Sequence, residues 1–352
     1  MNARVKKILS RLKQEGLDGL IVSSSANISY LSEIRSRDAY LVLSRKGCAY
    51  LTDSRYTEEV RNKLRDFSLP KISAPPLSVI SVILKDLGVR RAGFESDHLS
   101  FSQCRRLKND CPKNISLVPT SGLIEEFREI KDAGEIAKIR RATSIASEAL
   151  KYIGRFIVAG KREIEIAAEL EHFIRYRGGY SASFEIIVAS GPNSAFPHHQ
   201  TSRRRLGRNE PVLIDMGVDY AGYKSDLTRV FFLGKINPLA RKIYGIVREA
   251  AGRALKRVKP AGIINQIDGA ARQYITDNGY GGFFGHNIGH GIGLEIHENP
   301  AISPRRKDRL KAGMVFTIEP AIYLPHKFGI RIEDVVLVTE KGARLLSGTL
   351  DK

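Results

Sequence analysis

Apolar positions near the start of the chain recur at the spacing of a helix that buries one face: Val5, Ile8, Leu9 and Leu12. Residues 17–23 then form a mostly apolar run, which predicts a buried strand. Residues 39–43 and 49–52 flank a basic, glycine-containing turn and predict a hairpin. Helix and strand signals alternate in this way to about residue 120, so the pattern predicts an α/β domain.

A break at residues 119–122, which read Pro-Thr-Ser-Gly, separates this region from a different pattern. Residues 123–154 and 163–177 predict long helices, and two further helices follow Pro238 and Gly262, while strand-like runs lie between them. Helices and antiparallel strands segregated in this way indicate an α+β domain.

A chain of 352 residues is long enough for two cores, so we expect two domains, 1–122 and 123–352. The second domain shows a weak internal repeat: it contains two pairs of acidic residues, and a turn separates the two members of each pair. A duplicated half-domain would explain this repeat. The pairs are Asp215 with Asp226 and Glu319 with Glu333.

Nothing in the composition predicts export or membrane insertion. Residues 1–12 are charged throughout, and no apolar run approaches the ~20 residues of a membrane span. Cys48, Cys104 and Cys111 form no Cys-x-x-Cys pair, which favours packing residues in a reducing compartment over a cysteine metal site. We therefore expect a cytoplasmic protein without a membrane partner.

The formal net charge of +19 raises the alternative of a nucleic-acid partner. Basic residues cluster at 203–208 and 305–311, but neither cluster is interleaved with the aromatic residues that stack on bases. A solvated basic surface is the preferred interpretation.

Asp215 and Asp226 stand on two strand-like runs, residues 212–217 and 223–232, that a short turn would bring together. An acid at the end of an apolar strand is costly unless it is paired or binds a metal. The alternative is that Asp215 caps a turn and Asp226 pairs with Arg229.

Residues 285–298 are rich in glycine and carry His286, His290 and His297. The glycines argue against a helical zinc motif and favour a backbone that passes close to a metal centre. A single histidine is more often an ordinary hydrogen-bonded residue, but three in one segment weaken that interpretation.

Glu319 and Glu333 also lie in apolar, strand-like runs. Arg331 is two residues from Glu333 and faces the same side of a strand, so a simple Arg331–Glu333 pair is one alternative. If the acids converge with one histidine, their mutual repulsion favours a pair of divalent cations, and such a pair is typical of hydrolases. The five candidate ligands are Asp215, Asp226, His290, Glu319 and Glu333.

Five short motifs in this order resemble the pita-bread metallopeptidase family, in its Xaa-Pro peptidase branch. They are Ile-Asp-Met-Gly, Ser-Asp-Leu-Thr-Arg, Gly-His-Gly-Ile-Gly-Leu-Glu-Ile-His-Glu, Thr-Ile-Glu-Pro and Arg-Ile-Glu-Asp. Residues 51–56 resemble a creatinase-type N-terminal domain. The resemblance therefore implies an α/β creatinase-like domain followed by an α+β pita-bread catalytic domain with duplicated halves and an antiparallel sheet.

The resemblance also implies a role for each ligand. Asp215 would bind one metal, Asp226 and Glu333 would bridge both metals, and His290 and Glu319 would bind the second. A water held between the cations would be acidified into the nucleophile. Oxygen ligands with one imidazole favour Mn²⁺, with Co²⁺, Zn²⁺ and Fe²⁺ as alternatives.

The remaining roles implied by the resemblance concern substrate. His198 and His297 would contact substrate and stabilise the tetrahedral intermediate, and Glu319 would pass a proton to the leaving nitrogen. Arg331 and His286 would support substrate and the metal carboxylates. Proline-containing peptides are the implied substrates, and a homodimer is the implied assembly.

Two departures from the family pattern bear on specificity. His199 follows His198, so the sequence leaves open which imidazole reaches substrate. Xaa-Pro dipeptidases commonly carry an arginine shortly after the His-Glu pair, where this chain has Ala301, and Arg305 is the nearest substitute. We therefore expect an Xaa-Pro aminopeptidase, with an Xaa-Pro dipeptidase (prolidase) as the alternative. Methionine aminopeptidase fits less well, and a non-catalytic pita-bread protein that binds peptides or nucleic acid is the remote alternative.

Overall fold

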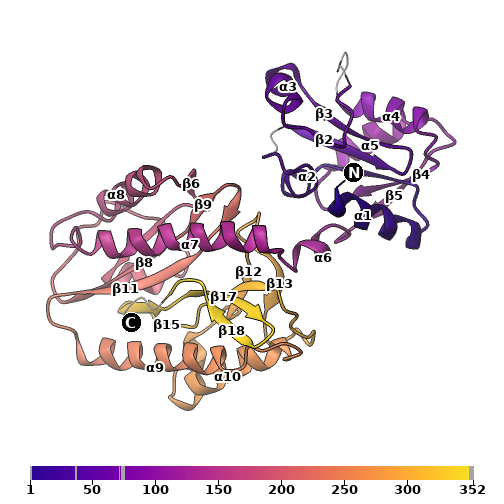
Figure 1. Ribbon diagram of the computed structural model, residues 1–352. Coiled ribbons are helices and arrows are strands. Elements are labelled where there is room, and N and C mark those ends of the chain that lie inside the picture. Colours follow the sequence, from indigo (N-terminus) through magenta and orange to yellow (C-terminus); the bar gives the residue numbers. More distant parts are fainter. Residues whose placement is uncertain (1, 36–37, 71, 73–75, 349–352) are drawn as a thin grey trace. The chain divides into compact units, whose positions relative to one another are not determined.

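The computed structural model describes residues 2–35, 38–70, 72 and 76–348 and divides into two compact units, Met1–Arg128 and Glu129–Lys352 (Figure 1). The boundary after residue 122 stays a prediction from the sequence. Residues 1 and 349–352, the outer ends of the two expected domains, lie outside the described residues.

The first unit is built on a mixed sheet with the strand order β3-β2-β1-β4-β5. The central strand β1 (Gly19–Val22) pairs antiparallel with β2 (Ala39–Ser44) and parallel with β4 (Arg91–Glu95). The outer strands are β3 (Gly47–Thr52) and β5 (Ser116–Thr120). The helices are α1 (Ala3–Gln14), α2 (Ser25–Ser32), α3 (Ser54–Arg61), α4 (Pro76–Asp86), α5 (Phe101–Asp110) and α6 (Glu125–Arg128).

The hydrophobic pattern of this unit is realised as expected. The four apolar residues of α1 are all buried, the run at 17–23 contains the buried strand β1, and β2 and β3 form the predicted hairpin. Cys48 is buried, and Cys104 and Cys111 are half-buried against the same core; all three are free thiols. The cysteines are therefore packing residues.

The second unit begins with an extended segment. We expected one helical region over 123–154, but α6 ends at Arg128 and α7 (Ala133–Ile153) starts five residues later. The backbone N–H of Lys131 donates to the carbonyl of Gly313, which holds the intervening residues extended. Asp132 then caps α7 reciprocally with Glu135, so the helix has a defined start.

The predicted helices of this unit are present as α8 (Glu163–Tyr176), α9 (Pro238–Leu255) and α10 (Ile264–Asp277). Two short 3₁₀ helices are η1 (Gly191–Ala195) and η2 (Gly281–Phe283). The strands of the first half are β6 (Ser181–Ala182), β7 (Ile187–Ser190), β8 (Glu210–Met216), β9 (Val218–Tyr220), β10 (Tyr223–Lys224) and β11 (Leu227–Leu233). The strands of the second half are β12 (Gly289–Gly291), β13 (Glu298–Ile302), β14 (Val315–Ile318), β15 (Ala321–Leu324), β16 (Phe328–Arg331), β17 (Asp334–Thr339) and β18 (Gly342–Leu345).

All named strand pairings in this unit are antiparallel. One sheet has the order β11-β8-β7 and another the order β13-β12-β14-β17-β18, with smaller sheets beside them. Helix α7 packs on β9, β10 and β11, whereas α9 packs on β14, β15 and β16. Each half thus pairs two helices with its own antiparallel strands, as the paired acids in the sequence suggest (Figure 1).

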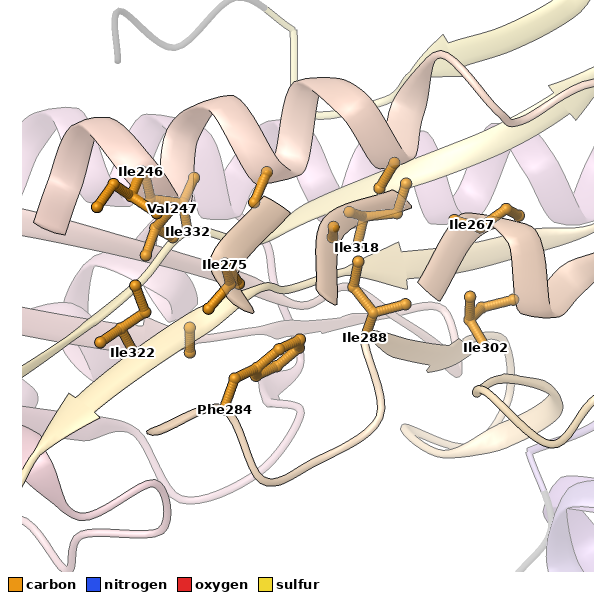
Figure 2. Packing of buried hydrophobic residues seen from close by; sticks show 14 of the residues in the cluster. Ile246, Val247, Ile267, Ile275, Phe284, Ile288, Ile302, Ile318, Ile322 and Ile332 are labelled. Carbon is orange, nitrogen blue, oxygen red and sulfur yellow. The ribbon is translucent and has the colours of Figure 1, made fainter. Parts of the chain in front are cut away.

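Two hydrophobic clusters fill the unit, one beneath each pair of helices. The first contains the buried faces of α7 and α8, and the second contains those of α9 and α10. Figure 2 shows the second cluster, in which Ile246 and Val247 of α9 and Ile275 of α10 point at Ile322 and Ile332 from the strand region. These side chains fix the strand ends that carry the acids. Of the helices in the described ranges, none combines the length and apolar character that a membrane crossing requires.

Candidate metal centre

One cavity of about 550 Å³ in the second unit brings together the site residues singled out in the sequence. Its lining includes all five candidate ligands. It also includes the residues expected to act on substrate or to support the site. These residues are Asp215, Asp226, His290, Glu319 and Glu333, together with His198, His286, His297 and Arg331.

Antiparallel pairing brings Asp215 and Asp226 to the same place. Asp215 lies in β8, opposite Thr228 of β11, and Asp226 immediately precedes β11. The connection is the β9–β10 hairpin, whose turn residues Ala221 and Gly222 have φ values of 51° and 87°. Two successive positive φ values are typical of the tight turns whose twist matches that of the strands. The short turn expected from the sequence is therefore present.

The alternative in which Asp226 pairs with Arg229 is wrong. Arg229 donates instead to Asp334 at 2.5 Å and to the backbone carbonyl of Glu333 at 2.6 Å. Asp226 therefore keeps its carboxylate for the cavity.

His290 reaches the cavity from β12, which is not helical. A Cβ on Gly289 would lie 1.9 Å from the carbonyl oxygen of Thr317, so only glycine allows this approach of the two strands. His290 Nδ1 lies 3.1 Å from the carbonyl of Gly291, a contact in which Nδ1 carries the proton. Its Nε2 then presents a lone pair 3.6 Å from Asp226 Oδ2 and 3.5 Å from Glu319 Oε1.

The two glutamates follow strand ends and are oriented by threonines. Glu319 comes directly after β14, and Glu333 lies between β16 and β17. The hydroxyl of Thr228 donates to Glu333 at 2.7 Å, and that of Thr317 donates to Glu319 at 3.4 Å. Each carboxylate thus has a hydroxyl donor that favours one orientation.

Three of the five candidates form the tightest group. Ligand atoms of Asp226, His290 and Glu333 all lie within 4.8 Å of one another. Buried oxygens of two carboxylates, Oδ1 of Asp215 and Oδ1 of Asp226, have no hydrogen-bond partner among the described residues. Buried carboxylate oxygens without donors are costly unless a cation neutralises them. The donor set therefore fits divalent metal.

Arg331 is the only arginine or lysine that the structure's described residues place in the cavity wall, and it is nearly fully buried. It forms an ion pair with Asp215 and donates to Tyr323 Oη at 2.7 Å and to the carbonyl of Pro197 at 3.3 Å. The simple Arg331–Glu333 pair is thus replaced by an Arg331–Asp215 pair. A single guanidinium leaves most of the carboxylate charge uncompensated.

The surroundings of the acids change their pKa values. Burial, followed by the charges of Glu333 and Asp215, raises the pKa of Asp226 well above its usual value. Burial likewise raises the pKa of Glu333, and it raises that of Glu319 to about 7. Burial lowers the pKa of His290 to about 4, so its imidazole is neutral and suited to bind a metal.

The other imidazoles occupy different parts of the cavity. His297 lies against His290, with ring centroids 4.3 Å apart. His286 Nε2 lies 3.1 Å from Tyr323 Oη, and burial lowers its pKa to about 4. In the His198–His199 doublet, His199 Nε2 contacts Glu163 Oε2 at 3.0 Å, whereas His198 is exposed at the cavity.

Sequence reasoning missed the groups that connect these residues. Tyr323 links Arg331 to His286, and Thr228 links Arg331 to Glu333. Glu163 was recognised only as the start of a helix. No local sequence pattern marks Tyr323. Glu163, at the N-terminal end of α8, is charged and fully buried, so it requires hydrogen-bonding partners. That requirement follows from its burial, which the sequence alone does not show.

Both units match models of known protein families. Residues 137–340 match the model of metallopeptidase family M24, and residues 4–130 match that of the creatinase/prolidase N-terminal domain. These matches, together with the structural neighbours below, confirm the predicted fold, a creatinase-like N-terminal domain followed by a pita-bread domain.

Similar proteins extend over the whole chain. The Xaa-Pro dipeptidase of Pyrococcus furiosus is 36% identical over 352 residues, which is 99% of each chain. A structure of an Xaa-Pro dipeptidase from Bacillus anthracis has a TM-score of 0.96 and 35% identity, covering 99% of this chain and 98% of that one. An X-Pro aminopeptidase structure from Thermotoga maritima has a TM-score of 0.90 and 35% identity, with coverages of 97% and 99%.

The raised pKa of Glu319 predicts how the chelator-treated protein responds to pH. The folded state keeps a proton up to about pH 7 that the unfolded state releases near its usual pKa of 4.5. The contribution of Glu319 to the free energy of unfolding should therefore fall as the pH rises between these values, with no loss below them. The lowered pKa values of His286 and His290 act in the opposite direction, so the parent is compared with a variant of Glu319. Urea titrations at pH 4.5, 6 and 7.5 measure this.

Glu319→Gln should change the pH dependence, because it removes this carboxyl and its falling contribution. Glu340→Gln, at an exposed position, is the matched control and should leave it unchanged. A free energy of unfolding that differs between the chelated parent and Glu319→Gln by the same amount at every pH would contradict the electrostatic account.

Proposed function

The chain belongs to metallopeptidase family M24, and on this premise we propose that it is a two-metal Xaa-Pro dipeptidase. The proposed reaction is hydrolysis of the bond between a residue and the proline that follows it. The observation that carries this proposal is the cavity, whose lining contains the five candidate metal-ligand side chains and four further histidines.

The proposed ligands are Asp215, Asp226, His290, Glu319 and Glu333. The unpartnered oxygens of the two aspartates and the raised pKa values of the buried acids support cation binding. When bound, two divalent cations would polarise the scissile carbonyl and acidify the attacking water. Mn²⁺ is the metal that we propose, because four of the five ligands are carboxylates.

The protein's own groups would carry the proton and the developing charge. Glu319 would accept a proton from the attacking water and return it to the proline nitrogen as the carbon–nitrogen bond breaks. His198 and His297 would donate hydrogen bonds to the carbonyl oxygen as it gains charge. Arg331 would hold Asp215 in place through their ion pair.

The same cavity has a surface for an apolar ring. Phe184, Ile187 and Ile296 line it beside the imidazoles. A proline ring buries apolar area and has no N–H to satisfy once its nitrogen is acylated, so this lining suits it. We also propose that the protein is cytoplasmic and acts as a homodimer, with domains 1–122 and 123–352.

The aminopeptidase activity that Ala301 led us to expect is the second candidate. Among the described residues that line the cavity, Arg331 is the only arginine or lysine, and its guanidinium is engaged by Asp215, Tyr323 and Pro197. None of these described residues therefore offers a free guanidinium to the carboxylate of a dipeptide, which favours longer peptides as substrates. The relatives named as dipeptidases, which match both units, favour the dipeptide.

Removal of metal should abolish activity. Dialysis against a chelator is expected to remove turnover of Xaa-Pro substrates, and Mn²⁺ or Co²⁺ should restore it. Asp226→Asn should lose metal and most activity, whereas Asp277→Asn, at an exposed position, should match the parent. Metal content by elemental analysis accompanies each assay. Full activity in a metal-free sample would exclude the two-metal proposal.

The two histidines of the doublet should respond differently. His198→Ala should lower kcat by about 10²–10⁴-fold with parental metal content, the range for a positioned proton-transfer or hydrogen-bonding group. His198→Asn, which retains a hydrogen-bond donor, should lose less. A silent His198→Ala together with a large loss in His199→Phe would assign the substrate contact to His199 itself.

Substrate length separates the two candidate activities. We expect a higher kcat/KM for Xaa-Pro dipeptides than for matched Xaa-Pro-Yaa tripeptides under the same metal loading. Xaa-Ala peptides are the control and should be poor substrates, because they lack the ring that packs in the cavity. A clear preference for the tripeptide would assign the chain as an Xaa-Pro aminopeptidase.

A further inference from the structure

Glu163 is a fully buried carboxylate to which the reaction above assigns no role. It is the first residue of α8, and its side chain has no exposure to solvent. A buried charge is costly unless it is fully hydrogen-bonded. Its hydrogen-bonding partners therefore indicate the role of the charged carboxylate.

Six donors converge on this carboxylate. Oε1 accepts from the backbone N–H of Ser190 at 2.8 Å, from the Ser190 hydroxyl at 2.7 Å and from the Asn193 amide at 3.0 Å. Oε2 accepts from His199 Nε2 at 3.0 Å, from the backbone N–H of Ser202 at 3.1 Å and from its hydroxyl at 2.6 Å. Every partner belongs to residues 190–202, the segment that carries His198.

The hydroxyl directions are fixed by a neighbouring arginine. Arg204 donates to the Ser190 hydroxyl at 2.6 Å, and its backbone N–H donates to the Ser202 hydroxyl at 3.1 Å. Both hydroxyls therefore accept from Arg204 and give their own protons to Glu163. Burial alone would raise the pKa of Glu163, but hydrogen bonds from Ser202, His199 and Ser190 bring it below its usual value.

His198 is thus held on both sides. The carbonyl of Pro197, the preceding residue, accepts from Arg331, and the imidazole of His199, the following residue, is bound by Glu163. His198 itself is exposed at the cavity. Its position depends on these two anchors.

We propose that Glu163 is a positioning residue, which holds His198 in the cavity through His199 and the backbone of residues 190–202. The proposal rests on the proposed function for the role of His198. It also gives the second histidine of the doublet a task, because the His199 imidazole is the link between the carboxylate and its neighbour.

Glu163→Gln tests the charge with little change of shape. Every partner of Glu163 is a donor, so the amide NH₂ would face three donors at either oxygen position. We expect kcat to fall by about 10-fold or more, since a displacement of about 1 Å can cost 10²-fold, with KM and metal content near the parental values. Glu171→Gln, exposed on the same helix, is the matched control and should match the parent.

A double-mutant cycle separates positioning from a general structural role. If Glu163 acts through His198, adding Glu163→Gln to His198→Ala should lower kcat by less than about 2-fold. Two losses that multiply would overturn the proposal, as would a folded Glu163→Gln enzyme with parental kcat. His199→Gln, which can still donate to Glu163, should retain more activity than His199→Phe; equal loss in both would also overturn it.

Amide hydrogen exchange tests the anchor without any substrate. Exchange of residues 196–200 should accelerate in Glu163→Gln and stay parental in Glu171→Gln. If Glu163→Gln fails to fold, Ser202→Ala removes a single donor and should show the same changes in smaller measure. Parental exchange in folded variants would overturn the anchor, whereas a parent that cleaves no Xaa-Pro peptide would overturn only the proposed function.

Discussion

Mutual repulsion among four clustered carboxylates is the constraint on which the second unit depends. Asp215, Asp226, Glu319 and Glu333 line one cavity, and burial together with the charges of neighbouring acids raises the pKa values of Asp226, Glu319 and Glu333. Strand ends fixed by two apolar clusters resist the relaxation that would separate the acids. The hydrophobic core thus holds a cation-binding site in a geometry that the acids alone would not adopt.

Arg331 reduces this repulsion at Asp215 and also restrains several neighbouring groups. Its guanidinium contacts Asp215, the hydroxyls of Tyr323 and Thr228, and the carbonyl of Pro197. A planar group with five donors can bind several acceptors at once, which an ammonium does less well. The same side chain therefore sets the orientation of a proposed metal ligand and of the segment that carries His198.

The sequence predicted the elements whose signal is local. The helix over α1, the β2–β3 hairpin and the non-helical glycine segment around His290 all followed from spacing and turn residues. Asp226 was harder, because a pairing with nearby Arg229 was equally consistent with the sequence until Arg229 was found on Asp334. Tyr323 and Glu163 could not be predicted, since their roles arise from contacts between residues far apart in the chain.

Three imidazoles of the cavity are positioned in the same way. A histidine that must face substrate has an open side, so apolar packing cannot fix it from every direction. Isolated buried ion pairs add little stability, but they restrict geometry. Here a pair with at least one fully buried charged member holds the backbone beside three of these imidazoles: Glu163 and His199 beside His198, Asp268 and Arg272 beside His286, and Lys131 and Glu298 beside His297. Charge buried behind the cavity wall thus supplies the rigidity that the open face of the cavity cannot.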